Sequence, residues 1–421
     1  MSVADYEPVI GLEVHCQLAT RTKMFSGCPQ GIGEPPNTMV DAYTLGLPGT
    51  LPVPNAQAIR YGIALALALG CELQPVSRFA RKHYFYPDLP KGYQITQADR
   101  PYALGGAIEI EAGTIRLHHI HFEEDAGKNI HVAGEDVSLV DFNRAGAPLL
   151  EIVGEPDLRC AADAAEYLRA LRAIVRTLGI SEANMEQGTL RCDANVSLRR
   201  RGTEPFGTRC EIKNLNSFRF LERAIDAEIR RQADLLDHGE AVVMATMSFD
   251  ADRNTTKIMR TKEEAADYRY LPEPDLPPLI LPEAWIEELR AAQPELPAAR
   301  RERYRDAGLS GDDAKLLVED PELAAYFDAV VAEGADTKAA ANWVSGELLA
   351  KLDGASVTES NVGAAQLAEL IGMVADGTVS GRSAKQVFST VWTEGGSPRA
   401  VAERDGHRQV SDTSVLEAAV A

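Results

Sequence analysis

Hydrophobic and polar residues alternate strictly from residue 119 to residue 123. Ile120 and Phe122 occupy one set of alternate positions, and the other set carries possible ligands: His119, His121 and Glu123. A period of two predicts a β-strand with one apolar face and one polar face. Glu124 and Asp125 continue the acidic run into a turn that contains glycine.

A second run, residues 149–153 with the sequence LLEIV, is apolar enough to be a strand covered on both faces. Glu151 therefore lies where an ionised carboxylate is costly unless it is paired or bound to a cation. One interpretation is an ion pair with Arg144 or Arg159, and the other is a metal site. The histidines and acidic residues nearby favour the metal site.

Three further segments have polar strand faces. Residues 9–18 and 184–199 alternate, and residues 211–217 begin with a pair of charges on one face. The polar residues that share a face are, in chain order, Glu13, His15 and Gln17, then Arg191, Asp193 and Asn195, then Glu211 and Lys213. Each face alone is typical of a salt-bridged sheet surface. Several such faces in one domain indicate a polar cavity or channel across the sheet.

The helical periodicity is found elsewhere in the chain. Residues 56–69 are rich in alanine and leucine, and residues 161–179 have one apolar side. A third helix is expected after Asn216 or Ser217, either of which can cap it. From Leu281 onward the chain is rich in alanine and glutamate, which favours helices.

Basic, aromatic and turn residues alternate in residues 79–94. The stretch is either a solvated loop with aromatic side chains in the core or a site for an anionic ligand. In the second interpretation Arg81, Lys82 and Lys91 bind the anion, and Gly92 lets the backbone come close to it. The sequence contains neither GxxxxGKS/T nor GxGxxG, so a nucleotide would be bound without a P-loop or a Rossmann turn.

Composition sets the class of protein. The length of 421 residues suggests about two or three domains, and 45% hydrophobic with 25% charged residues is typical of a soluble globular protein. We find no apolar run long enough for a membrane span and no signal peptide, so we expect a cytoplasmic protein. The 6 cysteines form no CxxC pair, which argues against a disulfide framework. The net charge of −20 argues against a broad nucleic-acid-binding surface, but allows a local basic patch.

Long motifs across nearly the whole chain resemble those of the B subunit of the glutamine-dependent aspartyl/glutamyl-tRNA amidotransferase family. They are GLEVH, TKMFSGC, PNT, GLPGTLPV, RKHYFYPDLPKGYQITQ, EEDAGK, SLVDFNRAGAPLLEIV, LRCDANVSLR, EIKNLNSF, MRTKEEAADYRYLPEPDLP and NW. The resemblance implies an α+β fold with a sheet-rich cradle domain over residues 1–280 that contains a polar cavity. An all-α domain over residues 281–380 and a short helical tail over residues 381–421 would follow.

The resemblance also implies an activity. The chain would be a ligase subunit in a heterotrimer with an amidase-type A subunit and a small C subunit. The A subunit would release ammonia from glutamine. The B subunit would phosphorylate the side-chain carboxylate of misacylated Glu-tRNA(Gln) or Asp-tRNA(Asn) with ATP before ammonia attacks. Phosphorylation is needed because a free carboxylate would have to expel oxide, and phosphoryl transfer needs Mg²⁺ and cations on the phosphates.

Residue roles come from the same resemblance. The expected Mg²⁺ ligands are His15, Glu123 and Glu151, and it is left open whether Glu13 binds the ion or only contacts a ligand. Phosphate contacts or an ammonia tunnel are expected from Arg81, Lys82 and Lys91. A polar tunnel for ammonia is expected from Glu124, Asp193, Glu211 and Lys213.

The chain departs from the family pattern in two places. Some members have a cysteine cluster that could hold zinc, but here only Cys28 remains, so we expect no zinc. The tail is expected to be truncated, ending soon after a helix opened by Ser411 and Asp412. Two rival functions are a non-enzymatic tRNA-binding scaffold and a free-standing carboxylate–amine ligase. The sequence does not tell Glu-tRNA(Gln) from Asp-tRNA(Asn) as the preferred substrate.

Overall fold

The computed structural model describes residues 3–97, 99–132, 134–261 and 269–409. The chain divides into two compact units, Met1–Pro294 and Glu295–Ala421, and each is described by itself. The first unit is dominated by β-strands and the second is helical. The predicted α+β class is therefore confirmed. The helix expected at Ser411 lies outside the described residues.

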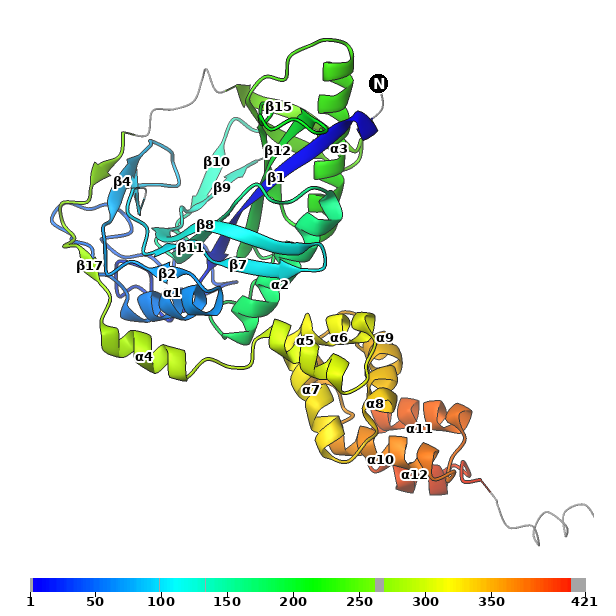
Figure 1. Cartoon of the computed structure of the whole chain (residues 1–421). Helices are drawn as coiled ribbons and strands as arrows, with labels where there is room; N and C mark the ends of the chain where they lie inside the picture. The colour runs from blue at the N-terminus through cyan, green and yellow to red at the C-terminus, as the bar shows by residue number, and fades with distance from the viewer. Residues whose placement is uncertain (1–2, 98, 133, 262–268, 410–421) are drawn as a thin grey trace, which may run out of the picture. The chain divides into compact units, whose positions relative to one another are not determined.

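A large sheet forms the first unit (Figure 1). Among the described residues it contains 10 strands in the order β15-β14-β13-β12-β1-β11-β8-β6-β2, with β7 pairing beside β8. The strands are β1 (Tyr6–Gln17), β2 (Glu72–Leu73), β6 (Ala103–Leu104), β7 (Ala107–Ile110), β8 (Gly113–Glu124), β11 (Pro148–Gly154), β12 (Leu190–Arg200), β13 (Cys210–Leu215), β14 (Ala245–Asp250) and β15 (Thr255–Thr261). The first strand of the chain thus lies in the middle of the sheet, between β11 and β12.

Two long helices, α2 (Ala161–Thr177) and α3 (Phe218–Asp237), cover one face of this sheet (Figure 1). Leu12 and Val14 of β1 are in the same hydrophobic core as Leu168 of α2. Since side chains alternate along a strand, the polar residues between them face the other side of the sheet. Of the two predicted caps, Ser217 is the one that begins α3, where its hydroxyl accepts a hydrogen bond of 3.1 Å from the Phe220 N–H.

Smaller elements complete the first unit. A 3-10 turn, η1 (Val3–Asp5), precedes β1, and three small sheets lie beside the large one. They are formed by β16 (Leu271–Pro272), β4 (Ala80–His83) and β5 (Tyr93–Thr96), by β9 (Lys128–His131) and β10 (Ser138–Asp141), and by β3 (Val76–Ser77) and β17 (Leu279–Ile280). Residues 79–94 therefore contain two paired strands around a loop, and are not simply a solvated loop.

The first unit extends beyond the expected boundary at residue 280 because α4 (Glu283–Ala291) packs on α1 (Ala56–Ala68) (Figure 1). The Arg60 guanidinium on α1 lies 5.3 Å from the ring centre of Trp285 and 2.6 Å from the Glu288 carboxylate. Gln293 donates a hydrogen bond of 2.9 Å to the carbonyl of Ala64. These contacts hold the first helical segment after residue 280 against the sheet domain.

The second unit is built around one core. Its elements are α5 (Pro297–Asp306), α6 (Gly311–Val318), α7 (Pro321–Ala332), α8 (Thr337–Trp343), η3 (Val344–Leu348), α9 (Leu349–Leu352), η4 (Val357–Glu359), α10 (Ala364–Ala375), α11 (Gly381–Glu394) and α12 (Pro398–Arg404). Phe327, Leu370 and Phe388 share the same hydrophobic cluster, so the expected boundary at residue 380 falls inside this unit. No helix within the described ranges is sufficiently long and apolar to cross a membrane.

Candidate active site

Strand register creates a row of polar side chains across the middle of the sheet. His121 on β8 is opposite Glu151 on β11, which is opposite His15 on β1. His15 is in turn opposite Arg191 on β12. Directly opposed residues have their Cβ atoms about 5 Å apart, so these side chains meet although they come from distant parts of the sequence.

A neighbouring row begins with Glu13, which is opposite Asp193 on β12. The register between β12 and β13 shifts between Cys192 and Ala194, so this pair of strands has a β-bulge. Lys213 on β13 lies with its Nζ 2.6 Å from Asp193 and 2.8 Å from Glu211. Asp193 of β12 thus forms one ion-pair network with Glu211 and Lys213 of β13, although the sequence places them on two separate strands.

Glu151 is the centre of the first row. Its Oε2 lies 3.3 Å from the His15 Nε2 and 3.4 Å from the His121 Nε2, and its side chain is 12% exposed. Burial alone would raise the pKa of Glu151, but the imidazoles of His121 and His15 hold it well below its usual value. The two arginines considered as partners bind elsewhere: Arg144 contacts Asp125, and Arg159 contacts Glu7. The arginine ion-pair interpretation of Glu151 is therefore wrong.

Glu123 joins this cluster through His121. The His121 Nε2 lies 3.4 Å from the Glu123 Oε1, and Gln94 donates a hydrogen bond of 3.0 Å to the other oxygen of Glu123. Burial opposes the charged imidazole, yet Glu151 and Glu123 together raise the pKa of His121 to about 10. His121 thus holds two buried carboxylates in place, which is how hydrogen-bond partners commonly orient metal ligands.

The donor atoms fit a divalent cation. One ligand atom each from His15, Glu123 and Glu151 lies within 4.8 Å of the others, and the same holds for Glu13, His15 and Asp193. Carboxylate oxygens are the ligands that Mg²⁺ prefers, whereas imidazole is a less usual partner for this ion. The three expected Mg²⁺ ligands are therefore neighbours, and His15 belongs to both groups. Burial is the main reason that the pKa of Glu13 rises to about 7.

The three cations of the basic stretch have different surroundings. Lys91 forms an ion pair with Glu124, and both side chains are buried. Arg81 makes a two-pronged contact with Glu273, at 2.8 and 2.9 Å, and lies 3.0 Å from Asp275. Both residues are thus paired with carboxylates inside the protein.

Lys82 is held near the candidate metal-binding cluster of His15, Glu123 and Glu151. Burial would lower the pKa of Lys82, but the carboxylates of Glu123 and Glu151 raise it. Lys82 also lines a cavity of about 370 Å³ together with Glu13, Glu211 and Lys213. It is therefore the member of the basic stretch placed to act on a ligand beside the cluster.

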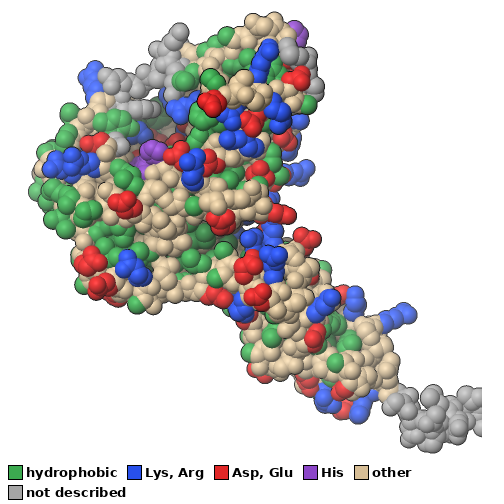
Figure 2. Space-filling view, viewed as in Figure 1, with side chains coloured by type: hydrophobic (Ala, Val, Ile, Leu, Met, Phe, Trp, Pro, Cys, Tyr) green, Lys and Arg blue, Asp and Glu red, His purple; other side chains and the backbone are tan. Residues whose placement is uncertain are grey.

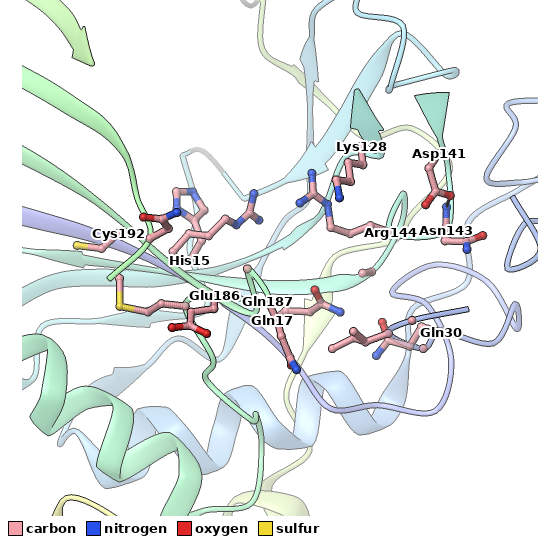
Figure 3. Close-up of a pocket in the computed structure, with 18 of the residues that line it drawn as sticks. His15, Gln17, Gln30, Lys128, Asp141, Asn143, Arg144, Glu186, Gln187 and Cys192 are labelled. Carbon is pink, nitrogen blue, oxygen red and sulfur yellow. Dashed lines mark hydrogen bonds between the residues drawn. The ribbon is translucent and has the colours of Figure 1, made fainter. Parts of the chain in front are cut away.

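A second and larger cavity of about 800 Å³ opens over His15 (Figure 3). Its lining is mixed: polar side chains such as Gln17, Lys128, Arg144 and Gln187 lie beside apolar ones such as Met185 and Leu215. Lys213 lines both cavities, and His15 is the member of the cluster that lines the larger one. Figure 2 shows histidine and acidic side chains in a hollow of the first unit.

Comparison with known proteins decides the family. Residues 8–287 match the family model described as the GatB/GatE catalytic domain, and residues 325–421 match the one described as the GatB domain. The chain belongs to the GatB family. The predicted resemblance is confirmed, and the cluster, both cavities and the paired basic residues all lie within the match to the catalytic domain.

Curated GatB relatives are named as the B subunit of aspartyl/glutamyl-tRNA(Asn/Gln) amidotransferase. The relative from Anaeromyxobacter sp. (strain K) is 52% identical over 100% of this chain and 89% of its own length. The relative from Thioalkalivibrio sulfidiphilus is 51% identical, and that from Dechloromonas aromatica is 49% identical. Both of these alignments cover 99% of this chain and 89% of the relative.

Sequence reasoning missed several residues of the site. The alternation indicates His121 only as a possible ligand, whereas its Nε2 lies 3.4 Å from a carboxylate oxygen of each of two candidate metal ligands, Glu123 and Glu151. Asp125 pairs with Arg191 at 2.6 Å, and Tyr43 accepts a hydrogen bond of 2.9 Å from Lys91. The alternation that placed Arg191 on a polar face was a usable signal for the first of these pairs. Tyr43 lies in a loop without periodicity and gave no such signal.

Proposed function

We propose that this chain is the B subunit of an ATP-dependent tRNA amidotransferase, a carbon–nitrogen ligase. It would convert Glu-tRNA(Gln), Asp-tRNA(Asn) or both to the amidated forms, assembled with an amidase-type A subunit and a small C subunit. One observation carries the proposal: donor atoms of His15, Glu123 and Glu151 lie close enough together to bind one Mg²⁺, and His15 also lines the larger of two cavities that share Lys213.

The two cavities suit a reaction with two large substrates. The carboxylate to be activated and the phosphate that activates it must approach the same point in line. The 800 Å³ cavity would take the aminoacylated end of the tRNA, since amide groups such as Gln17 and Gln187 can hydrogen-bond a polar substrate (Figure 3). The smaller cavity, on the Glu13 side, would take the phosphates of ATP.

His15, Glu123 and Glu151 would hold Mg²⁺, and Glu13 either binds it or contacts a ligand. When bound, Mg²⁺ neutralises charge on the phosphates and orients them for transfer. His121 keeps Glu123 and Glu151 oriented by its contacts of 3.4 Å with each. The two carboxylates share the His121 imidazole as a counter-charge, and a bound cation would offset the negative charge that remains in the cluster.

Ammonia would reach the activated carboxylate along the charged residues around the cluster. Lys91 and Glu124 form a buried pair, and Gln94 donates hydrogen bonds to Glu123 and to the backbone of Glu124. Asp193, Glu211 and Lys213 form the ion-pair network on the other side of Glu13. We assign both groups, with Lys82, to a polar passage in which ammonia can exchange hydrogen bonds.

The test uses the chain assembled with its A and C subunits. ATP cleavage is measured with glutamine, with and without Glu-tRNA(Gln) and then Asp-tRNA(Asn). We expect cleavage to depend on a misacylated tRNA and to match amide formation. A complex that binds the tRNA but shows no ATP cleavage would indicate the scaffold instead. Cleavage stimulated by free glutamate or aspartate alone would indicate the free-standing ligase.

A further inference from the structure

The smaller cavity is rich in cations although the chain as a whole has a net charge of −20. Four basic side chains line it, against two carboxylates: Lys82, Arg209, Lys213 and Arg260, with Glu13 and Glu211. Charges of one sign focused on one small space attract a ligand of the opposite sign. The lining therefore indicates an anionic ligand with more than one negative charge.

Strand register explains how Arg260 reaches this cavity. Glu211 on β13 is opposite Thr246 on β14, which is opposite Arg260 on β15. The β14 and β15 register shifts after this pair, so that Met247 is opposite Ile258 and one extra residue, Met259, is inserted in β15. A regular pairing would have placed Met259 opposite Thr246. Bulges commonly re-aim a side chain beside an active site, and here the bulge brings in a guanidinium.

The four basic side chains differ in how they pair with carboxylates of the protein. Lys213 is paired with Asp193 and Glu211, and the pKa of Lys82 responds to Glu123 and Glu151. Arg209 and Arg260 are both exposed, and neither forms an ion pair within the part of the chain that the structure describes. Among the described residues, two guanidinium groups that line this cavity are thus without a carboxylate partner.

We propose that Arg209 and Arg260 bind the β- and γ-phosphates of a nucleoside triphosphate in this cavity. The inference rests on the proposed function and deepens it. Arg209 and Arg260 replace Arg81 and Lys91 as the expected phosphate contacts, because Arg81 is paired with Glu273 and Lys91 with Glu124. Lys82 lines the same cavity and stays a candidate for either phosphate binding or the ammonia passage.

The size and position of the cavity favour a triphosphate over a phosphate of the tRNA backbone. A volume of about 370 Å³ lies at the small end of ligand pockets and suits a compact, highly charged group. A backbone phosphate carries a single charge, which would neutralise only one of the two guanidinium groups that form no ion pair among the described residues. Glu13 lines the cavity and also belongs to a candidate metal group with His15, so bound phosphates would lie beside the cation site.

The experiment compares Arg209→Gln, Arg260→Gln and Arg260→Lys with Arg253→Gln, each in the chain assembled with the A and C subunits. Arg253 is an exposed arginine on the turn between β14 and β15 and is the matched control. The KM for ATP and the KM for misacylated tRNA are measured separately. Inorganic triphosphate is added as a competing probe that contains only the phosphate part of the nucleotide.

We expect each glutamine variant to raise the KM for ATP about tenfold or more, since a charge-assisted hydrogen bond is lost. Inhibition by inorganic triphosphate should weaken in parallel, the KM for tRNA should change less than about twofold, and Arg260→Lys should recover part of the loss. Arg253→Gln should behave as the wild type.

Two results would overturn this inference. A raised KM for tRNA with an unchanged KM for ATP would show that the cavity binds the tRNA backbone. Unchanged values for both substrates would show that the two arginines bind neither. In each case the wild-type complex still cleaves ATP in a tRNA-dependent manner, whereas failure of the proposed function would remove that activity from the wild type itself.

Discussion

Replacing Glu151 with glutamine tests the metal-binding cluster at its centre. The amide has nearly the shape of the carboxylate and can still accept hydrogen bonds, but it removes a charge 3.3 Å from His15 and 3.4 Å from His121. His121 keeps Glu123 as a partner at 3.4 Å. We therefore expect Glu151→Gln to fold and to lose about 1.5–3 kcal/mol of unfolding free energy, as for one charge-assisted hydrogen bond.

The effect of Glu151→Gln on activity should be much larger. Loss of a residue that merely orients a metal ligand commonly reduces metal affinity or activity about 10- to 100-fold, and Glu151 is a candidate ligand itself. We expect tRNA-dependent ATP cleavage and amide formation at limiting Mg²⁺ to fall at least about 100-fold. Glutamine hydrolysis by the A subunit should change less.

The control for this variant is Glu240→Gln, which makes the same chemical change at an exposed position after α3. Both variants are assembled with the A and C subunits and titrated with Mg²⁺ in the ATP-cleavage assay. If Glu151→Gln amidates Glu-tRNA(Gln) at the wild-type rate at limiting Mg²⁺, the assignment of the metal ligands is wrong.

Three further predictions concern other parts of the molecule. Lys82→Met should abolish amide formation. If ATP cleavage is lost in parallel, Lys82 binds phosphate; if cleavage is retained, Lys82 belongs to the ammonia passage. Unchanged amidation would refute both roles. Mg²⁺ at 100 times its Kd should raise the unfolding free energy of the wild type by about 2.7 kcal/mol in denaturant titrations, and should not raise that of Glu151→Gln. An equal increase in both proteins would show that the ion binds elsewhere. Glu228→Gln should cost about 3–5 kcal/mol at pH 7, because the buried Glu228 pairs with Arg231 at 2.6 Å. Burial alone would raise the pKa of Glu228, but its hydrogen bonds, first among them the one from Arg231, lower the pKa from 4.5. The cost of the substitution should therefore shrink as the pH falls below 4.5 and Glu228 becomes protonated. A cost that does not change with pH would refute the charge argument.

Local patterns were sufficient to predict the faces of the strands. Alternation along β1 and β8 placed His15, His121 and Glu123 on polar faces, and all three lie in the cluster. The apolar run around Glu151 correctly indicated a carboxylate in a costly position. These predictions depend only on the two-residue period of a strand.

The pairing between distant strands could not be predicted in the same way. Register decides that Glu151 is opposite both His15 and His121, and β1, which carries His15, is separated from β11 by more than a hundred residues. The contact of Arg81 with Glu273 likewise follows from the pairing of β4 with β16. A charge in a sequence does not reveal whether it faces a ligand or a partner in the protein.

The bulges and the extent of the first unit were also beyond local reasoning. The register shift near Asp193 is not marked by a glycine or proline in its strand, so nothing in the sequence signalled it. Helix α4 has an ordinary helical sequence, and only its contacts with α1 assign it to the sheet domain.

Phosphorylation of the side-chain carboxylate can be detected directly, because it transfers an oxygen atom from the tRNA-bound amino acid to phosphate. The complex is given ATP, glutamine and Glu-tRNA(Gln) whose side-chain carboxylate carries a heavy oxygen isotope. Activation by phosphorylation leaves one carboxylate oxygen on the phosphate when ammonia displaces it. We expect labelled inorganic phosphate in proportion to the amide formed, and we expect Glu151→Gln to lose both products. Amide formation with unlabelled phosphate would show that the carboxylate is not activated by phosphorylation.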